Sequence, residues 1–155
     1  MKPSMHFDLS KLHQFIAGLE GTKKMVVKVG IMGQKVARGD GPTNADIGAK
    51  HEYGSFSEHI PMRSFLRMPL HQKGEEIIAD TARHSKEAMV AGNIKQVLVN
   101  LGVACETVIG KAFATGGFGQ WKPLAPFTVE QKGHSLILIE SRQLERAITS
   151  KVESK

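Results

Sequence analysis

The segment Thr43–Leu70 reads TNADIGAKHEYGSFSEHIPMRSFLRMPL and carries the strongest structural signals in the chain. Thr43 is followed three residues later by Asp46, which is the spacing of a capping box at the start of a short helix. Gly54 is the expected end of this helix, because glycine readily adopts the backbone conformation that follows a helix. Ile60-Pro61 then predicts an extended arm, since the residue before a proline is disfavoured in the helical region.

This segment lacks the residue spacing of a catalytic or metal site. Its histidines, His51 and His59, are eight residues apart, with Gly54 between them, and two carboxylates, Glu52 and Glu58, lie nearby. A helical zinc-protease site needs two histidines four residues apart. The glycine-rich residues 30–41, GIMGQKVARGDG, also lack the lysine and hydroxyl pair of a phosphate-binding loop. We therefore predict a protein that is not an enzyme and that uses neither metal nor cofactor.

Upstream of this segment, the sequence predicts a helix, a strand and a loop. Asp8 is placed to cap a helix with one apolar stripe, and Gly21 is its expected end. Residues 25–31 alternate apolar side chains, as a half-buried strand does. Residues 33–42 contain three glycines and a proline, which is typical of a mobile loop.

Two longer helices are expected downstream. Pro69 suits the first position of one helix, and Asn93 with Gln96 repeats the capping-box spacing at the start of the other. Three residues widen the apolar face of this second helix: Val99, Val103 and Ile109. We therefore expect it to be buried on more than one side, within the core or against a neighbouring subunit.

The C-terminal part is predicted to be mostly irregular. Residues 116–127 form a long loop, residues 128–131 a short helical turn, residues 136–139 a buried strand, and residues 141–148 a short helix or turn. The predicted fold class is α+β, in which a small central sheet packs against several helices and long flexible loops connect them. Residues 1–155 are expected to form a single domain.

The composition fits a soluble chain with a modest excess of positive charge. The 155 residues carry a formal net charge of +6 and one cysteine, Cys105, which we expect to be an inert, small hydrophobic side chain. No apolar run approaches the roughly 20 residues of a membrane span, so no membrane partner is expected. The positive excess falls mostly in the first third: Lys23, Lys24, Lys28, Lys35 and Arg38. It suits an acidic or nucleic-acid partner, or simply a solvated basic face.

Several strings together carry a family resemblance. They are Ala45-Asp46-Ile47-Gly48, His51-Glu52-Tyr53-Gly54, Ile60-Pro61-Met62-Arg63-Ser64-Phe65-Leu66, and downstream Trp121-Lys122-Pro123-Leu124 with Thr128 and Lys132. This pattern resembles the phage virion morphogenesis family of Mu-like phages and the wider group of tail-completion and head–tail joining proteins. The matching motif residues are Ile47, His51, Glu52, Tyr53, Gly54, Pro61, Trp121, Leu124, Thr128 and Lys132. Where the family usually has Thr-Gly before a leucine, this chain has Ser141-Arg142 before Gln143-Leu144.

The resemblance implies a structural virion protein at the top of the tail or in the neck. Such a subunit forms a ring, commonly a hexamer, through which DNA passes without specific binding. Its implied partners are copies of itself, the tail tube protein and the head–tail connector or adaptor proteins. It would be assembled in the host cytoplasm and remain in the virion.

Two segments are candidates for these contacts. The arm contributes Ile60, Met62, Arg63, Phe65, Leu66 and Arg67, in which apolar and charged residues are mixed as in an interface. Alternatively, Phe65 and Leu66 fill the protein's own core and Arg63 makes a structural hydrogen bond. The loop contributes Gln34, Lys35, Arg38 and Asp40, either as a segment that orders on assembly or as an ordinary surface loop. The alternative function is that of a small basic nucleic-acid-binding protein.

Overall fold

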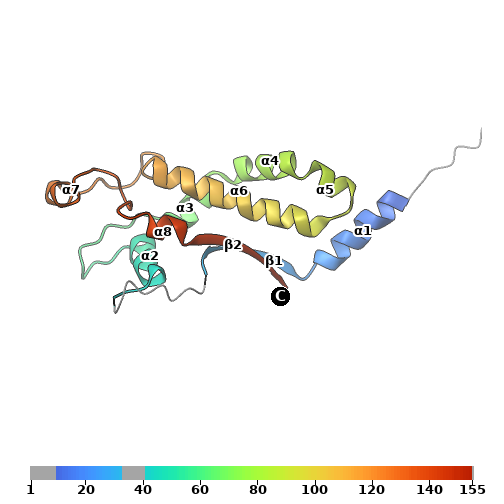
Figure 1. Cartoon of the computed structure of the whole chain (residues 1–155), viewed down its shortest axis with the longest axis horizontal. Helices are drawn as coiled ribbons and strands as arrows, with labels where there is room; N and C mark the ends of the chain where they lie inside the picture. The colour runs from blue at the N-terminus through green and yellow to red at the C-terminus, as the bar shows by residue number, and fades with distance from the viewer. Residues whose placement is uncertain (1–9, 33–40, 155) are drawn as a thin grey trace, which may run out of the picture.

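A long central helix organises the computed structural model of this chain, which describes residues 10–32 and 41–154. Helix α6 (Ile94–Ala114) lies between a layer of helices on one side and a two-stranded sheet on the other (Figure 1). The sheet pairs β1 (Met25–Ile31) antiparallel with β2 (Ile148–Ser154). The register places Met25 opposite Ser154 and Ile31 opposite Ile148. The fold is therefore α+β, as the sequence predicts.

Seven further helices are present in the described ranges. They are α1 (Ser10–Thr22), α2 (Asn44–Tyr53), α3 (Arg67–Gln72), α4 (Gly74–His84), α5 (Lys86–Val90), α7 (Pro126–Lys132) and α8 (Gln143–Arg146). The α4 and α5 helices pack along α6, α1 projects from one end of the elongated molecule, and α7 lies at the other end (Figure 1). The α2 and α8 helices pack together near α7 and frame the region described in the next section.

Helix α6 is buried on two sides, as expected. On the sheet side, Gly102 lies against Ser150 of β2 and Val27 of β1. On the other side, Ala104 and Val108 pack with Ile77 of α4. Two residues that were expected to widen the buried face are instead exposed, Val99 at 38% and Val103 at 53%.

The composition of α6 also corrects the expectation about membrane spans. By length and apolar composition alone, this helix is sufficient to cross a bilayer. In the structure it packs against both strands and against α1, α3, α4 and α5. The core helix of a domain can have the same length and composition, and the packing of α6 between two layers accounts for the apolar residues that it buries.

Local capping chemistry is confirmed in two helices. The Thr43 hydroxyl accepts a hydrogen bond from the Asp46 N–H at 3.2 Å, and an Asp46 carboxylate oxygen accepts one from the Thr43 N–H at 3.0 Å. This completes the predicted capping box of α2, which ends before Gly54. The side chain of Asn93 likewise accepts a hydrogen bond from the Gln96 N–H at the start of α6.

Several predicted boundaries were wrong. Residues 136–139 form a turn rather than a strand, because Leu138 has a positive φ of 57°, which no strand accommodates. The second strand instead begins at Ile148, where a helix or turn was expected to end. The helix expected to begin at Pro69 begins at Arg67, and breaks near Lys73 and Ser85 divide the predicted run into α3, α4 and α5.

Predictions near the N-terminus have mixed outcomes. The first helix continues past Gly21 to Thr22, whereas Asp8, its predicted cap, lies outside the described residues. The predicted contact loop, with Gln34, Lys35, Arg38 and Asp40, also lies outside them.

Candidate functional site

The carboxylate of Glu52 fixes the start of α3. It accepts hydrogen bonds from the backbone N–H groups of Phe65, Leu66 and Arg67 at 2.7, 2.9 and 3.2 Å. The Ser64 hydroxyl and the Arg67 Nε donate to it at 2.7 and 2.9 Å. A carboxylate at this position satisfies helix N–H groups that have no partner within the helix. Burial favours the neutral acid, but the hydrogen bonds from Leu66, Ser64 and Arg67 outweigh it and lower the pKa of Glu52.

The neighbours of Glu52 hold the same arm. The carbonyl oxygen of His51 accepts a hydrogen bond from the Arg63 N–H at 2.7 Å. The ring of Tyr53 lies under the Arg67 guanidinium, 4.5 Å from ring centroid to Cζ. Gly54 has a φ of 76°, and a Cβ atom there would lie only 3.0 Å from the Met62 nitrogen. The His51–Gly54 string therefore anchors the arm within its own chain.

The second motif string packs against the same arm. The Arg63 Nε donates to the carbonyl oxygen of Lys122 at 3.0 Å, and a terminal guanidinium nitrogen donates to that of Pro123 at 3.4 Å. The Trp121 Nε1 donates to the carbonyl oxygen of Ser64 at 3.2 Å. The arm and residues 121–123, which are far apart in sequence, are thus held together by hydrogen bonds.

A cavity of about 410 Å³ lies where these two strings meet. Six of the motif residues line it: Ile47, His51, Pro61, Leu124, Thr128 and Lys132. Arg63 contributes from the arm, and α8 contributes Gln143 and Leu144. Its size falls within the range of roughly 300–1,000 Å³ that is typical of ligand pockets.

Strained backbone is concentrated at this pocket. Three of its lining residues have positive φ angles: His59 at 53°, Leu138 at 57° and Arg142 at 57°. In residues 10–32 and 41–154, the only other residue except glycine with a positive φ is Phe118. This conformation costs about 1–2 kcal/mol for a residue other than glycine, and such strain is commonly found at functional sites. The pocket is therefore our candidate functional site.

The electrostatics of the pocket are dominated by positive charge. Burial lowers the pKa of the Arg63 guanidinium, whose residue is 6% exposed. Burial, followed by the charges of Arg63 and Lys132, also lowers the pKa of His51. The pocket has one lining carboxylate, Glu140, at its surface. An anionic group would therefore enter this cavity more easily than a cationic one.

The predicted interface arm is largely occupied by intramolecular contacts. Phe65 is fully buried, with its ring 5.4 Å from that of Phe113, and Arg63 is buried in the hydrogen bonds given above. In the single chain these two side chains therefore take the alternative roles, a core position for Phe65 and a structural hydrogen bond for Arg63. The contact of the arm with a neighbouring subunit stays a prediction. Ile60 and Leu66 are half-buried, whereas Met62 and Arg67 remain exposed.

Other reactive groups have local partners or an unreactive environment. Glu58 pairs with Lys50, and within the described part of the chain no group of three metal-binding side chains comes together. Burial, with a smaller contribution from Glu106, raises the pKa of the Cys105 thiol. A thiol with a raised pKa is a poor nucleophile at neutral pH, as expected for an apolar helix position.

Searches against protein-family models, curated proteins and solved structures find no match for this chain. The resemblance to the phage family therefore stays a prediction. Several lining residues were not predicted as site members, Lys122, Leu138 and Arg142 among them. Arg142 carried a sequence signal, because it stands where the resembled pattern usually has a glycine, and its positive φ is one that glycine adopts easily.

Proposed function

We propose that this chain is a structural protein of a tailed bacteriophage, a tail-completion or head–tail joining subunit that assembles into a ring. One observation carries the proposal. The two separate strings that resemble this family pack against each other and together line one pocket. Chance matches at distant positions have no physical reason to meet, whereas residues with a shared role do.

The departure of the sequence from the family pattern at Arg142 also supports this proposal. Arg142 stands where the family usually has glycine, and its φ of 57° is one that glycine adopts without strain. Leu144, the leucine that follows, is buried in the core at 4% exposure. The backbone at residues 141–144 therefore suits the family sequence, although the side chain at residue 142 differs.

Two features of the fold favour assembly with other copies. Both β1 and β2 have one edge without a partner strand in the described sheet. Such edges readily pair with another chain, and two unlike edges on one subunit suit the head-to-tail contacts of a ring. Large apolar side chains are also exposed on and beside the arm, with Phe56 at 97% and Met62 at 61%.

Light scattering of the purified protein across concentrations, with and without DNA, tests the proposal. A ring-forming subunit gives a mass that rises toward a hexamer and does not depend on DNA. Replacing both Phe56 and Met62 with aspartate should weaken this association. Ile78→Asp is the matched control, because Ile78 is 68% exposed on α4, away from the arm. Equal weakening by both changes, or a monomer at every concentration, would contradict assembly through the arm.

The alternative, a nucleic-acid-binding protein, has weaker support. Two basic residues of the first third have acidic neighbours, with Lys23 3.7 Å from Glu20 and Lys28 2.5 Å from Glu153. These pairs reduce the positive charge available to phosphates. Tight DNA binding by the monomer that is lost as salt rises would favour the alternative.

A further inference from the structure

The pocket contains cations without a carboxylate partner. The Arg63 guanidinium donates to two main-chain carbonyl oxygens, and the Lys132 Nζ donates to two others at 3.1 and 2.7 Å. Across residues 10–32 and 41–154, no ion pair includes either side chain. A guanidinium has five N–H donors and an ammonium has three, so both retain unused donors.

This uncompensated charge is unusual, because Arg63 is buried and Lys132 is half-buried. Burying a charge is costly unless an opposite charge lies close to it. His51 adds a third polar group, since its Nδ1 is buried without a hydrogen-bond partner. The three side chains come from α2, the arm and α7, and all line one cavity. An anion in this cavity would supply the missing counter-charge.

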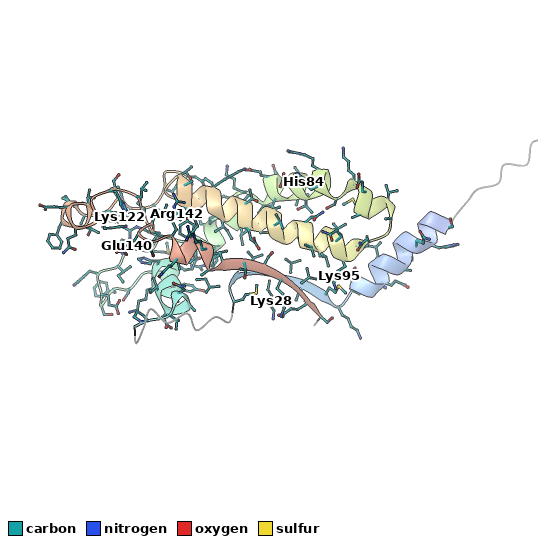
Figure 2. The ribbon with its side chains drawn as sticks, in the orientation of Figure 1. Lys28, His84, Lys95, Lys122, Glu140 and Arg142 are labelled. Carbon is teal, nitrogen blue, oxygen red and sulfur yellow. The ribbon has the colours of Figure 1, made fainter. Side chains whose placement is uncertain are left out.

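The rim of the pocket is also basic. Figure 2 places Lys122 and Arg142 near each other, with Glu140 beside them, at the end of the molecule that carries α7 and α8. Arg142 has an acidic neighbour outside the lining, Glu145, at 3.1 Å. The lining therefore carries more cations than carboxylates, which favours the approach of an acidic ligand.

The apolar part of the lining favours an acidic peptide over a nucleic acid as the ligand. Its apolar lining residues are Ile47, Ile60, Pro61, Pro123, Leu124, Ala125, Leu138 and Leu144. The bases of a nucleic acid stack on aromatic rings, and the described residues that line this pocket include no Phe, Tyr or Trp on which a base could stack. A peptide can offer a carboxylate and an aliphatic side chain a few ångströms apart, which matches both parts of the lining.

We propose that this pocket binds a partner protein through a peptide carboxylate and an adjacent aliphatic side chain. The carboxylate lies against Arg63 and Lys132, and the aliphatic group lies against Leu124 and Leu144. Either a chain terminus or an aspartate or glutamate side chain supplies the same chemistry. This inference stands on the pocket alone, so it holds whether or not the chain belongs to a virion.

N-acetyl-leucine is the first probe, because it combines a free carboxylate with a leucine side chain. Amide and side-chain NMR signals of the full chain are followed during titration. We expect saturable shifts at millimolar concentration, centred on His51, Lys132 and Leu144. N-acetyl-leucinamide, which lacks only the charge, should bind at least tenfold more weakly. Acetate, which lacks the aliphatic group, should also bind more weakly.

Variants locate the binding. A double variant, Lys122→Gln with Arg142→Gln, removes positive charge from two exposed positions at the rim. It should weaken the binding of N-acetyl-leucine severalfold without unfolding the chain. Lys86→Gln and Lys95→Gln, at exposed positions on α5 and α6, are the matched controls and should bind as the wild type does. Arg63→Gln should abolish binding, and its spectrum reports directly whether the fold is retained.

Three outcomes would overturn the proposal. One is equal binding of the acid and the amide, which would mean that charge is not recognised. Another is the absence of any saturable shift. The third is a stronger response of the same signals to inorganic phosphate or to a DNA duplex, which would assign the pocket to phosphate. A peptide ending in leucine and one with an internal glutamate beside a leucine then distinguish the two carboxylate sources.

Discussion

Glu52 and Phe65 are thirteen residues apart in sequence, and a carboxylate oxygen of the first accepts the backbone hydrogen of the second at 2.7 Å. This bond is one of five on the same carboxylate, so a single buried charge holds the arm, the start of α3 and the last turn of α2 together. Such a carboxylate has no substitute among uncharged side chains, because all five of its partners are donors.

Glu52→Gln should therefore be strongly destabilising. Glutamine keeps the size of the side chain, but its amide nitrogen donates and faces donors in this site. We expect a loss of about 2–4 kcal/mol in the free energy of unfolding, since hydrogen bonds to charged groups contribute about 1.5–3 kcal/mol each and do not add fully. Urea unfolding followed by circular dichroism measures it.

The matched control for this change is Glu58→Gln. Glu58 pairs with Lys50 at the surface, where an ion pair contributes about 0–1 kcal/mol. A comparable loss in both variants would mean that the five hydrogen bonds of Glu52 do not carry the stability assigned to them.

The stability of the fold should decline in two steps as pH falls. Burial and the charges of Arg63 and Lys132 hold the pKa of His51 below its ordinary value of 6.5. Below pH 6.5, the unfolded chain therefore takes up a proton that the folded chain binds less readily, which favours unfolding. The lowered pKa of Glu52 adds a second decline below pH 4.5, as its carboxylate is protonated more readily in the unfolded chain.

Urea midpoints measured from neutral to acidic pH test this order. His51→Gln should remove much of the first decline and leave the second. His71→Gln, at an exposed position of α3, should leave both unchanged. A midpoint that rises between neutral pH and pH 5 would have the wrong sign for a neutral buried histidine.

Two glycines of α6 should respond in opposite directions to alanine. A Cβ atom on Gly102 would overlap the side chain of Ser150, with the two Cβ atoms 2.7 Å apart, so Gly102→Ala must push β2 away from the helix. We expect a loss of about 1–3 kcal/mol, typical of an overpacked core. Thermal unfolding of both variants measures the difference.

Gly110→Ala is the control within the same helix. No atom lies within 4 Å of a Cβ atom at this position, so only helix propensity acts. Alanine should stabilise the helix by about 0.5–1 kcal/mol. If both glycines tolerate alanine equally well, the close contact between α6 and β2 is not as described.

Arg142→Gly should separate stability from binding. Glycine removes about 1–2 kcal/mol of left-handed strain, partly offset by about 0.4–1 kcal/mol of added freedom in the unfolded chain. The melting temperature should therefore stay the same or rise, while N-acetyl-leucine binds more weakly. Arg146→Gly, inside the short helix α8, should instead lower the melting temperature, because glycine is a poor helix former. A marked fall in stability for Arg142→Gly would contradict the strain at this position.

The sequence predicted what local chemistry determines. The capping box of Thr43 and Asp46 and the strand at residues 25–31 depend on residues close in sequence, and both are confirmed. Burial along this strand does not alternate as expected, because Gly30 is its one buried residue. The strand at residues 148–154 was missed because it is largely polar and becomes a strand only by pairing with β1. Leu136–Ile139 is apolar enough for a strand, but it supplies carbonyl oxygens to Lys132 from a turn.

In the candidate site, too, local features could be predicted and long-range contacts could not. The arm and the Trp121 string were singled out by resemblance, but nothing in the sequence indicates that Arg63 reaches the carbonyl oxygens of residues 122 and 123. The pocket is lined by residues between Ile47 and Arg63 together with residues between Lys122 and Leu144, so it exists only where these two parts of the chain meet. Such long-range contacts cannot be predicted from composition or from the periodicity of apolar residues.

The pairing of β1 with β2 also has a consequence for synthesis of the chain. The partner of Met25 is Ser154, so the sheet cannot be completed until nearly all of the described chain has been translated. Until then, the face of α6 that the sheet covers, including Gly102 and its neighbours, is without its cover on the nascent chain. An interaction with a ribosome-associated chaperone would be most useful in this interval, and an early stop before Ile148 should yield an aggregation-prone product.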